Sequence, residues 1–185
     1  NGYKADDKNR RKLEMFMDKS METEVQKVAS INDINFERNT DLVEVIGAEI
    51  DEKYYDALTA LSISKEVIQR QKDLKIVFSP IHGTGGVSVP PVLKRYGFEN
   101  VVLVEEQMTY DGNFPTVIYP NPEEKEALTL GLAKAKEIDA DLLMATDPDA
   151  DRVGIAVKNT DGEFVLMNGN QAATLMILYI IEAWE

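Results

Sequence analysis

Three aspartates stand at alternate positions in the segment ATDPDADRVGIAV, and an arginine follows the last of them directly. Asp147, Asp149 and Asp151 repel one another, so we expect a positive charge to lie among them. Mg²⁺ prefers carboxylate oxygens and often completes its shell with water or phosphate oxygens. Arg152 adds a planar donor fork that suits a phosphate. The segment predicts a Mg²⁺ site with Asp147, Asp149 and Asp151 as ligands, and phosphoryl transfer as its chemistry.

The apolar run DLLMATD, residues 141–147, predicts a buried strand that ends at the first of these aspartates. Open α/β sheets bind their ligands at the carboxyl ends of parallel strands. If the backbone stays extended beyond the strand, the three carboxylates point to one side, because side chains alternate with a period of two.

Strand and helix patterns alternate along the second half of the chain. Apolar runs predict strands at 74–81, 100–106 and 141–147, helices at 86–98 and 121–139, and a hairpin over 152–168 that turns at Asp161-Gly162. This alternation indicates an α/β fold, a three-layer α/β/α sandwich with a mostly parallel sheet. We also expect a charged helix over 5–30, a short strand at 42–47, helices beginning near Asp51 and Ser64, and a buried helix face at 172–181.

Other interpretations of the acidic segment fit less well. A calcium-binding EF-hand needs Gly and Glu at the sixth and twelfth positions counted from Asp147, where Arg152 and Lys158 stand. A haloacid-dehalogenase-like phosphotransferase would use the first aspartate as nucleophile, but its fifth residue is typically Thr or Val, and here it is Asp151. A solvated acidic loop that makes turns remains an alternative.

A second motif, SPIHGTGG at residues 79–86, lies between a predicted strand and a predicted helix. Its glycines would let backbone amides approach an anion. The dinucleotide-binding fingerprint fails, however, because Ser88 stands where the third glycine is needed. We favour a tight strand-to-helix turn, and we expect His82 to be a hydrogen-bonding group of this loop rather than a catalytic residue.

The composition restricts the partners. The net charge of −13 argues against nucleic acid and anionic membranes, which repel an acidic protein. The chain has no cysteine, it opens without a signal peptide, and its apolar run at 172–181 is about half of a membrane span. We expect a cytoplasmic protein.

The motifs SPIHGTG, DGNFP with PNPEE, and ATDPDADR resemble, in this order and spacing, the α-D-phosphohexomutases, the phosphoglucomutase/phosphomannomutase family. The resemblance covers about residues 40–170 and implies the second of four domains. It implies that Asp147, Asp149 and Asp151 hold Mg²⁺ and that Arg152 positions a phosphoserine or the substrate phosphate. The opening Asn1-Gly2-Tyr3-Lys4 is similar to the tail of the family's active-serine loop, which implies an acid/base or phosphate-contacting role for Lys4.

The resemblance also implies a division of the chain and an activity. Residues 1–39 would be the tail of the first domain with a helical arm, 40–168 the metal-binding domain, and 169–185 the start of the third. The parent would interconvert hexose 1-phosphate and 6-phosphate through a phosphoserine and a sugar bisphosphate, as an isomerase of carbohydrate metabolism. This chain alone is expected to be inactive, because none of its serines opens a Ser-His-Asn-Pro run. The alternative from another class is a non-catalytic interaction domain with a structural ion.

Overall fold

A computed structural model describes residues 19–37 and 39–183, which fall into two compact units divided between Ile46 and Gly47. Lys4 and most of the expected first helix lie outside the described residues. The first unit contains two short 3₁₀ helices, η1 (Ile31–Asp33) and η2 (Thr40–Leu42). The strand expected at 42–47 is wrong, because this segment pairs with no other strand in the described part of the chain.

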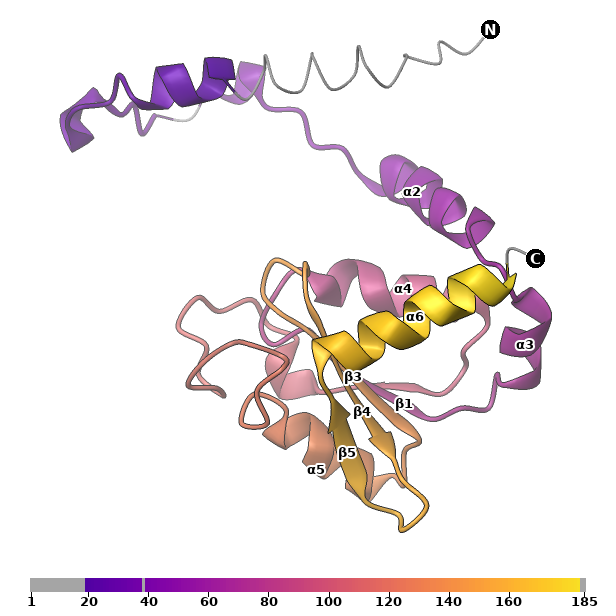
Figure 1. Ribbon diagram of the computed structural model, residues 1–185. Coiled ribbons are helices and arrows are strands. Elements are labelled where there is room, and N and C mark those ends of the chain that lie inside the picture. The colour runs from indigo at the N-terminus through magenta and orange to yellow at the C-terminus, as the bar shows by residue number, and fades with distance from the viewer. Residues whose placement is uncertain (1–18, 38, 184–185) are drawn as a thin grey trace, which may run out of the picture. The chain divides into compact units, whose positions relative to one another are not determined.

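The second unit is an α/β domain (Figure 1). Its helices are α2 (Ala48–Ala60), α3 (Lys65–Arg70), α4 (Gly85–Tyr96), the 3₁₀ helix η3 (Glu105–Gln107), α5 (Thr129–Glu137) and α6 (Gly169–Ala183). Its strands are β1 (Ile76–Ser79), β2 (Val101–Leu103), β3 (Leu142–Thr146), β4 (Val153–Lys158) and β5 (Phe164–Met167). The predicted alternation of strands and helices is confirmed.

The five strands form one sheet in the order β2-β1-β3-β4-β5. β1 runs parallel to β2 and β3, whereas β4 runs antiparallel to both β3 and β5. The α/β class is confirmed, but the sheet is evenly mixed rather than mostly parallel. The reason is that residues 147–152, which join β3 to β4, are too few for the crossover that a parallel neighbour requires.

Helices cover both faces of this sheet (Figure 1). The crossovers from β1 to β2 and from β2 to β3 run in opposite directions along the sheet, so their right-handedness places α4 and α5 on opposite faces. On the face toward α5, Leu143, Ala145 and Ala156 pack in one core cluster with Ala135 of that helix. The predicted three-layer sandwich is therefore confirmed.

The last helix, α6, differs from its expectation. Only Ala172 of this helix is buried, whereas its larger apolar side chains are partly exposed, from Leu175 to Ile181. α6 contacts β4, and a groove beside it is lined by Val157, Val165 and further residues of β5. The expected buried helix face is thus wrong within this chain.

Another difference concerns the helix expected at 121–139, which begins only at Thr129. Residues 121–128 form turns, in which the Asn121 side chain accepts a hydrogen bond from Glu123 N at 3.1 Å. Prolines 120 and 122 favour this irregular path because each lacks a backbone donor.

No helix in the described part of the chain has the length and apolar character needed to cross a membrane.

Candidate functional site

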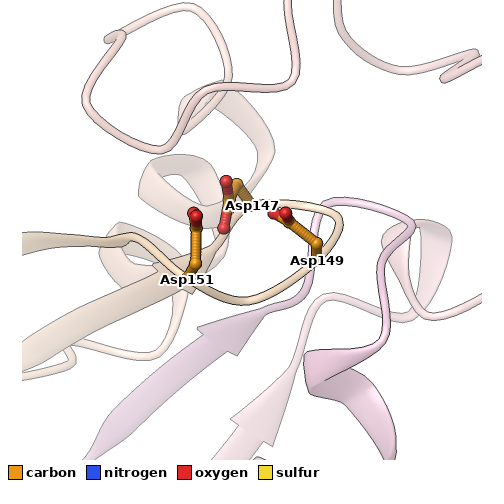
Figure 2. Close-up of side chains that lie close together, drawn as sticks. All are labelled: Asp147, Asp149 and Asp151. Carbon is orange, nitrogen blue, oxygen red and sulfur yellow. The ribbon is translucent and has the colours of Figure 1, made fainter. Parts of the chain in front are cut away.

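The three aspartates predicted as metal ligands come together at the carboxyl end of β3 (Figure 2). One carboxylate oxygen from each of Asp147, Asp149 and Asp151 lies within 4.8 Å of the others. The loop is a turn rather than the extended path that the sequence suggested. Ala150 N donates to Asp147 O at 3.1 Å, and Ala150 has a left-handed φ of 62°. The turn, instead of strand alternation, gathers the carboxylates.

Asp147 is buried, with 1% of its side chain exposed, and is held by Arg152. Its Oδ1 accepts from the backbone N of Arg152 at 3.0 Å, and its Oδ2 accepts from Arg152 Nε at 2.8 Å. Arg152 Nε also lies 3.7 Å from Asp151 Oδ1. The positive charge expected among the aspartates is therefore supplied in part by the chain itself.

The pairing with Asp147 uses only one of the three guanidinium nitrogens of Arg152, Nε. Its side chain is 45% exposed, and its terminal nitrogens make no hydrogen bond to the described residues. The hydrogen bond to Asp147 raises the pKa of Arg152, and the charges of Asp147 and Asp151 add to this effect. Arg152 can therefore hold the loop with Nε and present its two terminal nitrogens to an anion.

The pKa values of two of these carboxyl groups move in opposite directions. Burial by itself raises the pKa of Asp147, but hydrogen bonds from the backbone and side chain of Arg152 outweigh it and hold the pKa below its ordinary value. The pKa of Asp151 is raised, first by a hydrogen bond with Asp147 and then by the charges of Asp149 and Asp147. The cluster thus contains one carboxylate that is firmly ionised and one that is destabilised by like charge.

The glycine motif packs against the acidic loop. Thr84 N donates to Pro148 O at 2.9 Å, and a side chain at Gly83 would overlap the backbone of Pro148. A side chain at Gly85, the first residue of α4, would overlap the hydroxyl of Thr146. The tight strand-to-helix turn is confirmed. Gly83 is needed because its loop touches the acidic loop at Pro148, and Gly85 because α4 begins against Thr146 at the end of β3.

His82 is a buried hydrogen-bonding residue, as expected from the sequence. Its ring contacts the backbone of Thr109 and the hydroxyl of Thr116. Gln107, which is 1% exposed, bonds to both Thr116 and Ser79. The sequence analysis missed Gln107 and Thr116, because polar residues at the end of a short helical turn and in a loop give no pattern that indicates burial.

The excursion between η3 and α5 reaches the same edge of the sheet. The backbone of Pro122 lies so close to Gly154 in β4 that a side chain there would overlap it. Ile118 N donates to the carboxylate of Glu126 at 3.1 and 3.3 Å. Ile118 itself is 90% exposed, next to Tyr119. The PNPEE motif therefore packs against the start of β4, directly after the acidic loop.

Comparisons with known proteins agree with this arrangement. Residues 52–162 match the sequence model described as phosphoglucomutase/phosphomannomutase, alpha/beta/alpha domain II. A phosphoglucomutase from Staphylococcus haemolyticus is 37% identical over 150 residues, which are 81% of this chain and 27% of the relative. A phosphomannomutase from Mycoplasmoides pirum is 33% identical over 150 residues, again 81% and 27%.

The fold has a counterpart among solved structures. A crystal structure from Thermus thermophilus that carries the phosphomannomutase name aligns with 72% of this chain and 29% of its own, at 26% identity and a TM-score of 0.57. The three-layer α/β/α fold and the profile match together define the class of protein. The chain belongs to the phosphoglucomutase/phosphomannomutase family, and it spans about a quarter of the length of the curated relatives it matches. Because the chain belongs to this family, the haloacid-dehalogenase-like interpretation of the acidic segment is wrong.

Proposed function

We propose that this chain is the metal-binding domain of a hexose phosphate mutase, which interconverts hexose 1-phosphate and 6-phosphate through a phosphoserine, a sugar bisphosphate and Mg²⁺. The observation that carries the proposal is the convergence of three carboxylates beside a half-exposed arginine at the carboxyl edge of the sheet. In the same proposal, residues 40–168 are the second domain, 1–39 belong to the first, and 169–185 open the third.

The residues present suit Mg²⁺ chemically. The site offers oxygen donors only, and hard divalent cations prefer such ligands. Asp147, Asp149 and Asp151 would hold the ion, and Asp147 can still do so because each of its oxygens has a second lone pair beyond the bond to Arg152. When bound, Mg²⁺ supplies charge withdrawal from a phosphoryl group.

Arg152 is proposed to bind two oxygens of a phosphoryl group with its terminal nitrogens while Nε keeps its bond to Asp147. The charge of the guanidinium group would stabilise the equatorial oxygens during transfer and fix their orientation. Lys4 is proposed to act as an acid/base or phosphate-contacting group by its place in the Asn-Gly-Tyr-Lys run. The substrate would be a phosphosugar, and the protein is proposed to be cytoplasmic.

The metal assignment is tested by calorimetric titration of this chain with MgCl₂. We expect weak, saturable binding, because a phosphoserine oxygen is proposed as a further ligand and no serine of this chain occupies that context. Asp149→Asn removes one ligand charge without touching the Asp147–Arg152 pair, so binding should fall at least about tenfold. Asp161→Asn, in the exposed turn between β4 and β5, is the matched control and should bind as the wild type does. Equal binding by Asp149→Asn and wild type would refute the site.

The activity assignment requires a full-length enzyme that carries this domain. Glucose 1-phosphate with a catalytic amount of the bisphosphate should yield glucose 6-phosphate, and Asp149→Asn should abolish the conversion. The present chain incubated alone should yield none. Turnover by this chain alone would show that the phosphoserine mechanism is wrong.

A further inference from the structure

The hydrogen bonds around His82 form one continuous chain at the carboxyl end of β1. Ile81 N donates to Ser79 Oγ at 3.1 Å, and Ser79 Oγ donates to Gln107 Oε1 at 2.5 Å. Gln107 Nε2 then donates to Thr116 Oγ1 at 3.0 Å. Ser79, His82 and Gln107 are 1%, 5% and 1% exposed, whereas Thr116 at the outer end of the chain is half-buried. The direction of each bond is therefore constrained by its neighbours.

The last two links determine which ring nitrogen of His82 carries a proton. His82 Nδ1 lies 2.8 Å from Thr109 O, and a carbonyl oxygen only accepts, so Nδ1 must carry the proton. Thr116 Oγ1 lies 2.9 Å from His82 Nε2, which is an acceptor when Nδ1 alone carries the proton, so the hydroxyl of Thr116 then donates to Nε2. The chain of bonds is complete when the imidazole is neutral and in the Nδ1–H form.

The bond to Thr109 decides between the two neutral tautomers of His82, because a carbonyl oxygen has no proton to donate. With Nδ1 protonated, the neutral ring offers Nε2 as an acceptor. The hydroxyl of Thr116 has one proton and two lone pairs, so it can donate to Nε2 while it accepts from Gln107. The observed bonds are therefore all made by one neutral tautomer of His82.

The chain of bonds joins three segments that are distant in sequence. Ser79 ends β1, Gln107 ends η3, and Thr116 lies in the excursion between η3 and α5. His82 N also donates to Gln107 O at 2.9 Å. The backbone around His82 is strained, since Ile81 and His82 have φ values of 46° and 61°, a region that non-glycine residues rarely occupy. Such a conformation persists only where surrounding bonds hold it.

We propose that His82, Gln107 and Thr116 are positioning residues that hold the 109–119 excursion at the carboxyl end of β1, and that His82 transfers no proton. Thr116 is the described side chain of the excursion that hydrogen-bonds to this chain, through His82 and Gln107, and the ring of Phe114 packs edge-on against His82 with centroids 6.5 Å apart. The proposal concerns a segment at the same edge of the sheet as the three aspartates. It rests on the proposed function only in treating this edge as the side that binds the phosphosugar. The tautomer and the loop position do not depend on Mg²⁺.

The tautomer is measured directly, because His82 is the only histidine of the chain. Nitrogen-15 NMR of the wild-type chain should show a pyrrole-type Nδ1 and a pyridine-type Nε2. A neutral ring with its proton on Nε2 would overturn the proposal. This measurement needs no variant, so it stands even if a substitution prevents folding.

The positioning role is measured by amide hydrogen exchange. Thr116→Val keeps the shape of the side chain but removes the hydroxyl, and exchange at Phe114 and Val117 should become at least about tenfold faster. Thr116→Ser should restore the wild-type rate. Thr109→Val is the matched control and should change nothing, because His82 uses the backbone oxygen of Thr109.

The outcomes separate this proposal from the proposed function. Unchanged exchange in Thr116→Val would refute the positioning role, whatever the Mg²⁺ titration gives. Absence of Mg²⁺ binding in the wild type, together with the expected tautomer and exchange, would refute the metal site and leave the positioning role intact.

Discussion

The two edges of the sheet carry their charges in different ways. At the carboxyl edge of β1 and β3, Asp147 is buried against Arg152, and the glycines of one loop touch the backbone of another. At the opposite edge, Lys158 pairs with Asp139 at 2.6 Å, but the aspartate is 83% exposed. Buried charges need partners held in place, whereas exposed ion pairs contribute little to stability.

The glycines show the same contrast. Gly83, Gly85 and Gly154, all at the carboxyl edge, lie where a side chain would overlap neighbouring atoms. Gly162, in the turn at the opposite edge, has open space around it and a φ of 80°. Glycine is favoured there by the left-handed backbone conformation and not by a close contact. The carboxyl edge is thus closely packed by contacts between distant segments, and this packing defines the candidate site.

The largest effect is expected from Gly154→Ala. The new methyl group would overlap the backbone of Pro122, which cannot move aside as a flexible side chain can. We expect the free energy of unfolding to fall by about 3 kcal/mol, at the upper end for overpacking. Urea denaturation measures it. Gly112→Ala, where nothing lies within 4 Å, should stay within about 0.5 kcal/mol of the wild type. Equal losses in both variants would break the comparison.

Asp147→Asn should have the next largest effect. The substitution weakens two hydrogen bonds from Arg152 to a buried carboxylate. The free energy of unfolding should therefore fall by about 2 kcal/mol at neutral pH. Because the folded-state pKa of Asp147 lies below the unfolded value, its contribution is present above the unfolded pKa of about 3.9.

That contribution should be lost as the pH falls through the lower folded-state pKa of Asp147. Denaturation curves of wild type and Asp147→Asn should therefore differ at pH 7 and converge in acid. Asp139→Asn, at the opposite edge, is the control and should leave stability at pH 7 unchanged. A constant difference between wild type and Asp147→Asn at all pH values would contradict the ionised pair.

Arg152→Lys tests whether the carboxyl edge differs from the opposite edge in function as well as in stability. Lysine supplies a point charge but cannot hold Asp147 with one nitrogen and offer two others to a phosphate. In a full-length enzyme that carries this domain, kcat/KM should fall at least about tenfold, equivalent to roughly 1.4 kcal/mol. The melting temperature and Mg²⁺ affinity are measured on the same preparation and should change little. A lower melting temperature with unchanged kcat/KM would assign Arg152 a purely structural role.

The smallest effect is expected from Lys158→Gln. The substitution removes the ion pair with the exposed carboxylate of Asp139, and such pairs are weak and screened by salt. Thermal unfolding should give the wild-type melting temperature within experimental error at moderate ionic strength. A marked loss would mean that the opposite edge depends on buried charge as the carboxyl edge does.

The elements that make this site could be predicted from local patterns. β1 and β3 are short apolar runs, and the Asp161-Gly162 turn joins β4 to β5 as expected for a hairpin. The sequence analysis did not predict that β3 and β4 pair in the antiparallel direction. The 147–152 loop indicates this pairing, because it is too short for a parallel crossover. The late start of α5 was missed because acidic residues at 123–126 are typical of a first helical turn but here lie in turns.

By itself, the sequence determined the type of chemistry: three carboxylates and an arginine after a buried strand, with oxygen as the only ligand atom. The tertiary structure decided which of these groups is buried, which pairs with Arg152, and which glycines are required. It also brought Ser79, Gln107 and Thr116 together. The physical reason is that side-chain types and short-range spacing are written in the chain, whereas burial and hydrogen-bond partners arise only when segments distant in sequence are packed at one sheet edge.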